Sequence, residues 1–194
     1  MTITNHKPLE VILDKVDETV DGKEASLKTV LAAFGDRAFG PVLTLSGLFM
    51  LTPIGAIPGA PIAFCIIIAS FALQIILGRS RPWLPEKLNQ IEITQDNIDT
   101  TRKYIEPALE KIDLIAKPRM AWAATEKSRL VAALLSLFLA ASLVPLGAIP
   151  FGVLPSAIII ATLGMGIMAR DGLLLLTGFG LSALAAALIS TLIF

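Results

Sequence analysis

A six-residue motif, P-x-G-A-I-P, occurs twice in this chain, at residues 53–58 and 145–150. The copies are 92 residues apart, and the flanking apolar residues match at the same offset without a gap, as in residues 66–70 (IIIAS) and 158–162 (IIIAT). Proline has no N–H group for a helix, and glycine permits backbone angles that a helix lacks. Each copy therefore predicts two helices joined by a tight break.

The repeat has two possible meanings. Short hydrophobic segments interrupted by glycine and proline in corresponding halves of a membrane protein are a sequence signature of a transporter binding site. Duplication of a helical hairpin that simply packs well explains the same pattern without a ligand.

Composition places the chain in the membrane. Of its 194 residues 55% are hydrophobic, and the mean hydropathy is +0.76. Several apolar runs approach the length of a bilayer crossing, which predicts an integral membrane protein. The polar N-terminus lacks an early apolar run, so insertion is expected to begin at the first internal hydrophobic segment. Sixteen basic and sixteen acidic residues cancel, so nucleic acid is not an expected partner.

The predicted fold is an all-α integral membrane protein with two tandem helical hairpins, a charged amphipathic linker and a fifth transmembrane segment. Its parts in chain order are a cytoplasmic N-terminal arm, the first membrane repeat, a cytoplasmic or interfacial linker, the second membrane repeat and a C-terminal transmembrane segment, at residues 1–25, 26–79, 80–128, 129–171 and 172–194.

Five hydrophobic segments are expected within this fold, at residues 41–57, 60–77, 130–144, 153–169 and 173–194. At 1.5 Å per residue the first two are about 25 to 27 Å long, barely the thickness of the hydrocarbon layer.

Charge placement predicts the orientation. If each repeat is a hairpin, all 16 Lys and Arg residues lie on one side. The positive-inside rule makes that side cytoplasmic, with five crossings and an external C-terminus. The opposite side has little more than the two proline turns, which either reach the far interface or turn back inside the membrane as re-entrant pairs.

Several short sequences together resemble the ExoD family, integral membrane proteins named for a role in exopolysaccharide synthesis. The resemblance spans roughly residues 26–190 and rests on both copies of the proline motif and on Gly35-Asp36-Arg37, Gly78-Arg79, Pro82-Trp83-Leu84-Pro85, Lys117-Pro118-Arg119 and Asp171-Gly172. It implies a multi-pass protein of the bacterial inner membrane connected with polysaccharide synthesis or export, and it supplies no catalytic motif. The second repeat has Ala169-Arg170-Asp171-Gly172 where a second W-L-P sequence would fall, so the halves are not equivalent.

Signatures of catalysis are sparse. The single histidine, His6, lies in the N-terminal arm, and the single cysteine, Cys65, lies in an apolar run. A Ser-His site, a zinc cluster and a nucleotide-binding glycine loop are all missing from the sequence. We therefore expect no enzyme activity, no metal and no cofactor.

Candidate substrate-binding residues come from the repeat. Arg37 and Arg129 occupy equivalent positions and could bind phosphate or a carboxylated sugar through bidentate hydrogen bonds. Anchoring at the cytoplasmic interface is the simpler interpretation of both. At the breaks, glycine would let a ligand approach the backbone and proline would leave a carbonyl free for a sugar hydroxyl. The candidates there are Thr52, Gly55, Pro58, Gly147 and Pro150.

A second set of residues is expected to be structural. Trp beside arginines is favoured at the membrane interface. Prolines end helices, and an acidic residue caps the start of a helix. These residues are Arg79, Trp83, Pro85, Arg170 and Asp171.

Two functions remain open at this level. One is a small transporter or translocation factor for an anionic lipid-linked sugar, polysaccharide or related solute. The other is a non-transporting scaffold whose linker binds proteins of the polysaccharide machinery. Besides the lipid bilayer, the expected partners are such proteins and a second copy of the chain, because small-residue faces such as residues 183–187 suit close helix contact.

The orientation predicts a labelling pattern. Thr100→Cys and Asn5→Cys, in the linker and the N-terminal arm, should react with a membrane-impermeant maleimide only from the cytoplasmic side. Reaction of either residue in intact cells would contradict the predicted topology.

Overall fold

The computed structural model describes residues 25–26, 38–79, 83, 92–93, 119–149 and 151–193. These residues include five α-helices, namely α3 (Phe39–Met50), α4 (Ala60–Ile76), α7 (Glu126–Leu146), α8 (Leu154–Ala169) and α9 (Gly172–Ile193). Two short 3₁₀-helices, η2 (Pro53–Ala56) and η3 (Ala121–Ala123), accompany them. The strands β1 (Ala25–Ser26) and β2 (Glu92–Ile93) pair antiparallel. The helical class is confirmed for the described residues, and the two-residue strands were not predicted.

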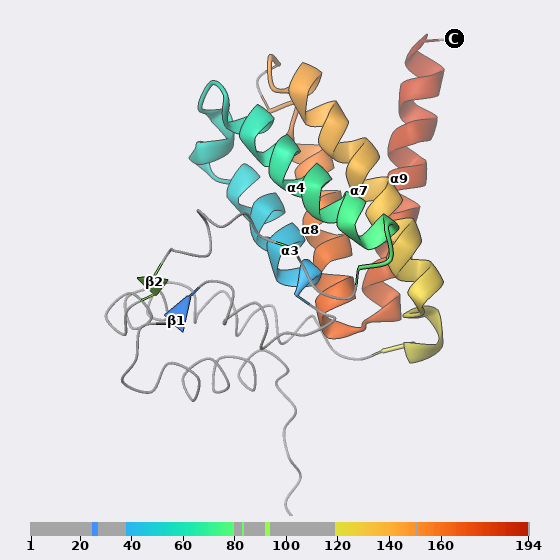
Figure 1. Cartoon of the computed structure of the whole chain (residues 1–194). Helices are drawn as coiled ribbons and strands as arrows, with labels where there is room; N and C mark the ends of the chain where they lie inside the picture. The colour runs from blue at the N-terminus through green and yellow to red at the C-terminus, as the bar shows by residue number, and fades with distance from the viewer. Residues whose placement is uncertain are drawn as a thin grey trace, which may run out of the picture.

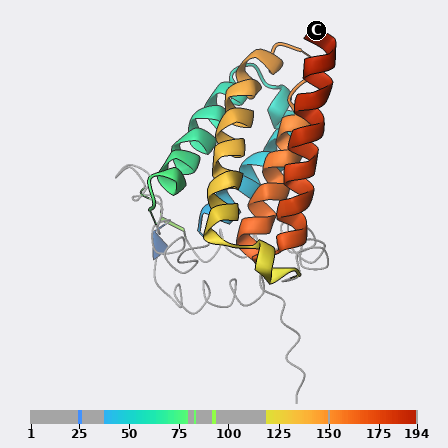
Figure 2. The same cartoon turned by 90° about the vertical axis from the view of Figure 1, so that its right-hand side faces the viewer.

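Consecutive helices run in opposite directions, so the two proline turns lie at one end of the bundle (Figures 1 and 2). The most extensive contacts join α3 to α8 and α4 to α7. Each helix of one repeat therefore packs mainly on a helix of the other, and α9 packs on the outside of α8.

Glycines allow α3 and α8 to approach closely. A Cβ atom at Gly164 would lie 2.5 Å from the backbone nitrogen of Thr44, and one at Gly40 would lie 2.7 Å from that of Met168. A Cβ atom at Gly47 would meet Ala157 and Ala161 just as closely. Small residues permit this backbone contact, which is how helices associate in a membrane. The Thr44 hydroxyl donates to the Gly40 carbonyl of its own helix at 2.9 Å.

The first proline turn begins earlier than predicted. Helix α3 ends at Met50, whereas the predicted segment continued to residue 57. Pro53 has no N–H group to donate to the Phe49 carbonyl. The Thr52 backbone N–H and hydroxyl donate to that carbonyl instead, at 3.1 and 2.6 Å. The twelve-residue helix is thus only about 18 Å long.

The second copy of the motif ends its helix differently. Helix α7 continues through Pro145 to Leu146, and the N–H of Gly147 then donates to the Leu143 carbonyl at 2.8 Å. Val144 occupies the position of Thr52 in the first copy and has no hydroxyl to compete for the helix carbonyls. Identical motif residues therefore terminate two helices at different points.

The other predicted segments agree closely with the observed helices. Helices α4, α8 and α9 begin and end within one residue of the prediction. Helix α7 begins at Glu126 instead of residue 130 because Thr125 caps it, accepting the Ser128 N–H at 3.2 Å.

Left-handed backbone angles recur at the repeat offset. Gly59 has φ of 92° and Phe151, 92 residues later, has φ of 62°. Gly78 and Arg170 have φ of 73° and 50° and are also 92 residues apart. The repeat in the sequence predicts that residues 37–79 and 129–171 superpose as two similar helical pairs, and these matched turns favour that prediction.

Helix length bears on the membrane assignment. Among the described residues, α7 alone is long and apolar enough to be a candidate for crossing a bilayer by length and composition. Helices α3, α4, α8 and residues 172–188 of α9 are apolar but shorter. The five-crossing topology therefore stays a prediction.

The α3–α8 contact can be tested with two glycine-to-alanine variants. Gly164→Ala places a methyl group against the backbone of Thr44 and should destabilise the protein by about 1–3 kcal/mol. A Cβ atom at Gly180 on α9 would meet nothing within 4 Å. Gly180→Ala should therefore stabilise the protein by up to about 1 kcal/mol. Thermal unfolding in detergent measures both, and equal effects would contradict the proposed close contact.

Candidate functional site

The two proline turns contact each other through Gly147 and Pro61. A Cβ atom at Gly147 would lie 2.8 Å from Cγ of Pro61, which is in the first turn of α4. The exit from the second motif therefore packs on the chain that leaves the first. Gly147 of the second break thus lies beside the start of the helix that follows the first break.

Both motif glycines have packing roles. Gly55 is buried, and a Cβ atom there would collide with the Met50 carbonyl oxygen. At Gly147 the same atom would be 2.9 Å from the Leu143 carbonyl oxygen as well as close to Pro61. A side chain at either position would therefore force neighbouring atoms to shift, whether or not a ligand binds.

The candidate binding residues of the turns other than glycine include two that are more accessible to solvent than Gly55. Thr52 and Pro58 are exposed, although the Thr52 hydroxyl proton is already bonded to the Phe49 carbonyl. Pro150 lies outside the described residues. The exposed surface of the turns thus consists mainly of apolar side chains.

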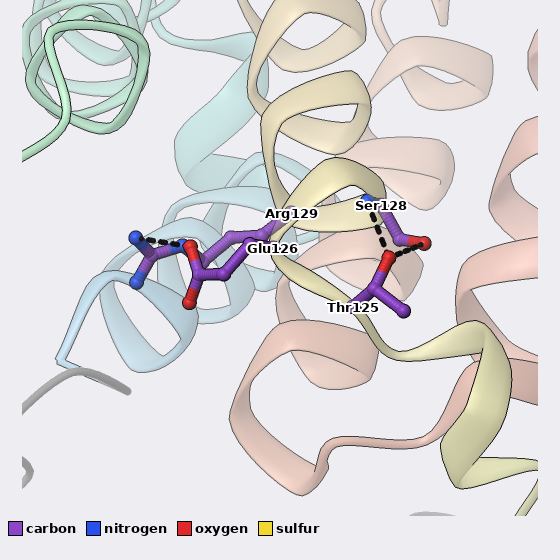
Figure 3. A network of polar contacts seen from close by, with 4 residues as sticks. All are labelled: Thr125, Glu126, Ser128 and Arg129. Carbon is purple, nitrogen blue, oxygen red and sulfur yellow. Dashed lines mark hydrogen bonds and ion pairs between the residues drawn. The ribbon is translucent and has the colours of Figure 1, made fainter.

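Arg129 lies at the opposite end of the bundle from the turns. Its guanidinium forms an ion pair with Glu126 at 2.9 Å, and its side chain is 16% exposed. Figure 3 shows this pair on one side of α7 and the Thr125–Ser128 cap on the other. Eighteen residues of helix, about 27 Å, separate Arg129 from Gly147. One small ligand group cannot contact both, and the equivalent Arg37 lies outside the described residues.

Asp171 caps α9 from a fully buried position. Its Oδ1 accepts the backbone N–H groups of Leu173 and Leu174 at 2.9 and 3.4 Å. Its Oδ2 has no hydrogen-bond partner among the described residues. The neighbouring Arg170 is exposed and ends α8 in the left-handed conformation.

Charges of the described helices and their adjoining turns gather at one end. Both described tryptophans, Trp83 and Trp122, are exposed near this end, as expected at a membrane interface. The charged residues are Arg79, Arg119, Glu126, Lys127, Arg129, Arg170 and Asp171. The turns at the other end have none, and no described group of three or more His, Cys, Asp or Glu could hold a metal ion.

Sequence comparison identifies relatives of this chain. The sequence model of the family described as "Exopolysaccharide synthesis, ExoD" matches residues 9–191. The chain belongs to the ExoD family. The resemblance predicted from the short motifs is confirmed, and the matched region is longer than residues 26–190.

Two curated relatives align with this ExoD-family chain over most of its length. Protein ExoD of Rhizobium meliloti is 28% identical over 165 residues, which cover 83% of this chain and 67% of the relative. An uncharacterized protein of Synechocystis sp. is 30% identical over 176 residues, covering 89% and 81%. No solved structure matches the chain. Membership of the family implies involvement in exopolysaccharide synthesis and, together with α7, suggests a membrane protein.

Sequence reasoning missed two polar contacts of this ExoD-family protein. In the first, the Gln74 side-chain amide pairs with the backbone of Trp83, accepting from N at 2.5 Å and donating to O at 3.2 Å. This contact holds Trp83 against α4, close in sequence to Arg79, which is exposed. Pro85 lies outside the described residues.

The second missed contact joins α7 to α8. The hydroxyl oxygens of Ser142 and Ser156 are 2.9 Å apart. Serines are common in apolar helices, where they usually bond to their own backbone. Only the packing of α7 on α8 distinguishes this pair from serines that bond to their own helix alone.

The role of Asp171 can be tested by removing its charge and its cap separately. Asp171→Asn keeps an oxygen at the Oδ1 position and should change the free energy of unfolding by only a few tenths of a kcal/mol, because Asn is an equally good cap. Asp171→Ala should cost about 1 kcal/mol. If thermal unfolding shows equal losses for both variants, the carboxylate charge is the essential feature and the capping role is wrong.

Proposed function

We propose that this ExoD-family chain is a multi-pass protein of the bacterial inner membrane that translocates an anionic lipid-linked sugar or a related solute during exopolysaccharide synthesis. It does so without catalysing a reaction. The observation that carries the proposal is the separation of charged and uncharged ends along one bundle, with the two helix breaks meeting at the uncharged end.

The arrangement of the helices supports movement between two units. The α3–α8 and α4–α7 pairs have extensive contacts, whereas α3–α4 and α7–α8 contacts are fewer. The bundle thus consists of two tightly packed pairs, each containing one helix from each repeat. Rocking of one rigid unit against another is the usual way in which repeat-containing transporters open alternately to the two sides.

The candidate binding residues fit two successive positions along a path better than one pocket. Arg129, and Arg37 by its equivalent place in the repeat, would attract an anionic headgroup at the cytoplasmic end. Thr52, Gly55, Pro58 and Gly147 belong to the far end, about 27 Å away, and Pro150 is a candidate there by its place in the repeat. The substrate would leave the arginines and pass the turns between the two helix pairs.

A scaffold of the polysaccharide machinery is the second candidate. The close packing around Gly55 and Gly147 favours it, because packing alone accounts for both glycines. In that case the turns would have no ligand, and the cytoplasmic linker would bind partner proteins.

A disulfide across the boundary between the pairs tests the translocation proposal. Ser142→Cys and Ser156→Cys, in a Cys65→Ser background, place two thiols where hydroxyl oxygens are 2.9 Å apart. Purified protein in vesicles should translocate a fluorescent polyprenyl-phosphate sugar when reduced. Oxidation should slow translocation at least about tenfold if the pairs must separate.

The two single-cysteine variants are the matched controls, and oxidation should leave both active. Equal rates in the oxidised and reduced double variant would contradict movement between α7 and α8. Absence of translocation by the unmodified protein, together with polysaccharide loss in cells lacking it, would favour the scaffold.

A further inference from the structure

We propose that the tips of the two proline turns are immersed in the hydrocarbon of the bilayer and do not project into water on the far side. The tip surface is defined here as the side chains of Ile57, Ile149 and Phe151. The proposal rests on the membrane insertion included in the proposed function, but not on translocation.

The tip side chains are large, apolar and exposed. Phe151 is 80% exposed, Ile149 57% and Ile57 55%. Residues 51–60 and 145–156 contain no Lys, Arg, Asp or Glu. A turn that enters water usually has polar residues, and an exposed apolar cluster of this kind marks a surface that another apolar phase covers.

Most backbone N–H groups of the second turn are paired within the chain, which suits a medium without water. In the second turn, five N–H groups donate to carbonyls three or four residues earlier, at 2.8 to 3.3 Å, and they belong to Gly147, Ala148, Ile149, Gly152 and Leu154. Prolines at positions 145, 150 and 155 have no N–H group that needs an acceptor. Hydrocarbon requires such internal pairing, because an unsatisfied backbone group there costs several kcal/mol.

Phe151 provides an independent indication. It adopts the left-handed conformation, which is unfavourable for a bulky residue, and the equivalent residue of the first repeat is Gly59. A glycine would remove the strain, and the exposed ring makes little contact with the rest of the bundle. Immersion of the ring in hydrocarbon would offset the strain, whereas exposure of the ring to water would offer no compensation.

The length of the helices places the tips at the required depth. Helix α4 has 17 residues and α8 has 16, about 26 and 24 Å. Starting from the charged end, where Trp83 and Trp122 mark the interface, these helices do not exceed a hydrocarbon thickness of about 30 Å. Helix α7, which leads into the second turn, has 21 residues, about 32 Å, and its first turn is charged, so its apolar part also fits within that thickness. The tips therefore fall within the bilayer or at its far edge.

Single cysteines at residues of matched exposure test the proposal. In a Cys65→Ser background, Ile57→Cys and Phe151→Cys are compared with Trp83→Cys and Trp122→Cys at the charged end, which are 59% and 73% exposed. A charged maleimide is applied to intact cells and to inverted membrane vesicles. An environment-sensitive fluorophore on each cysteine is then quenched by lipids with spin labels on their acyl chains.

We expect the tryptophan sites to react from one side only. The tip cysteines should react on the order of 100-fold more slowly from either side, because hydrocarbon disfavours the thiolate and excludes the reagent. Fluorophores at the tips should be quenched by the acyl-chain labels. Rapid reaction of the tips from the side opposite the tryptophans would overturn the proposal by placing the turns in water.

Slow reaction without quenching would also overturn it, because a protein surface would then cover the tips. Extraction of the unmodified protein from membranes by alkaline carbonate separates this failure from that of the proposed function. Complete extraction would exclude membrane insertion and contradict both, whereas a retained protein with reactive tips contradicts the tip proposal alone.

Discussion

The close contact of α3 with α8 determines the rest of the bundle. Gly40, Gly47 and Gly164 have no side chains to separate the two backbones, so the helices meet across the repeats. Because these helices belong to different hairpins, this contact positions α4 against α7 as well. Both proline turns are thereby placed at the same end. Helices inside a bilayer gain little from hydrophobic burial against one another, which makes such close backbone packing especially important.

A one-sided charge distribution follows from the same antiparallel arrangement. Arg79 follows α4, Arg129 begins α7, and Arg170 ends α8, so alternating helices place all three at one end. Arg129 retains Glu126 as an ion-pair partner there. The other end has apolar turns whose backbone groups are largely paired internally. Charged side chains suit the first end to contact with water or lipid headgroups, and apolar side chains suit the second end to contact with lipid.

The two copies of P-x-G-A-I-P show how neighbouring residues change the result of one motif. Thr52 donates twice to the Phe49 carbonyl and ends α3 before the first proline. Val144, at the equivalent position, cannot do so, and α7 continues to Leu146. The left-handed residue after each motif is nevertheless matched, as Gly59 and Phe151. At these matched positions the backbone angles therefore agree more closely than the helix ends do.

The amino-acid sequence by itself determined the helical class, the positions of the breaks, the family and the approximate limits of four of the five helices. Apolar periodicity, proline and glycine act locally, so they can be recognised without a structure. Only the tertiary structure decided that Gly164 meets Thr44 and that Ser142 meets Ser156. These relations depend on which helices pack together, and residues of one apolar helix give no indication of their partner helix. The sequence could therefore name the candidate binding residues and expect Arg129 and the turns on opposite sides, but it could not show which helices pack around them.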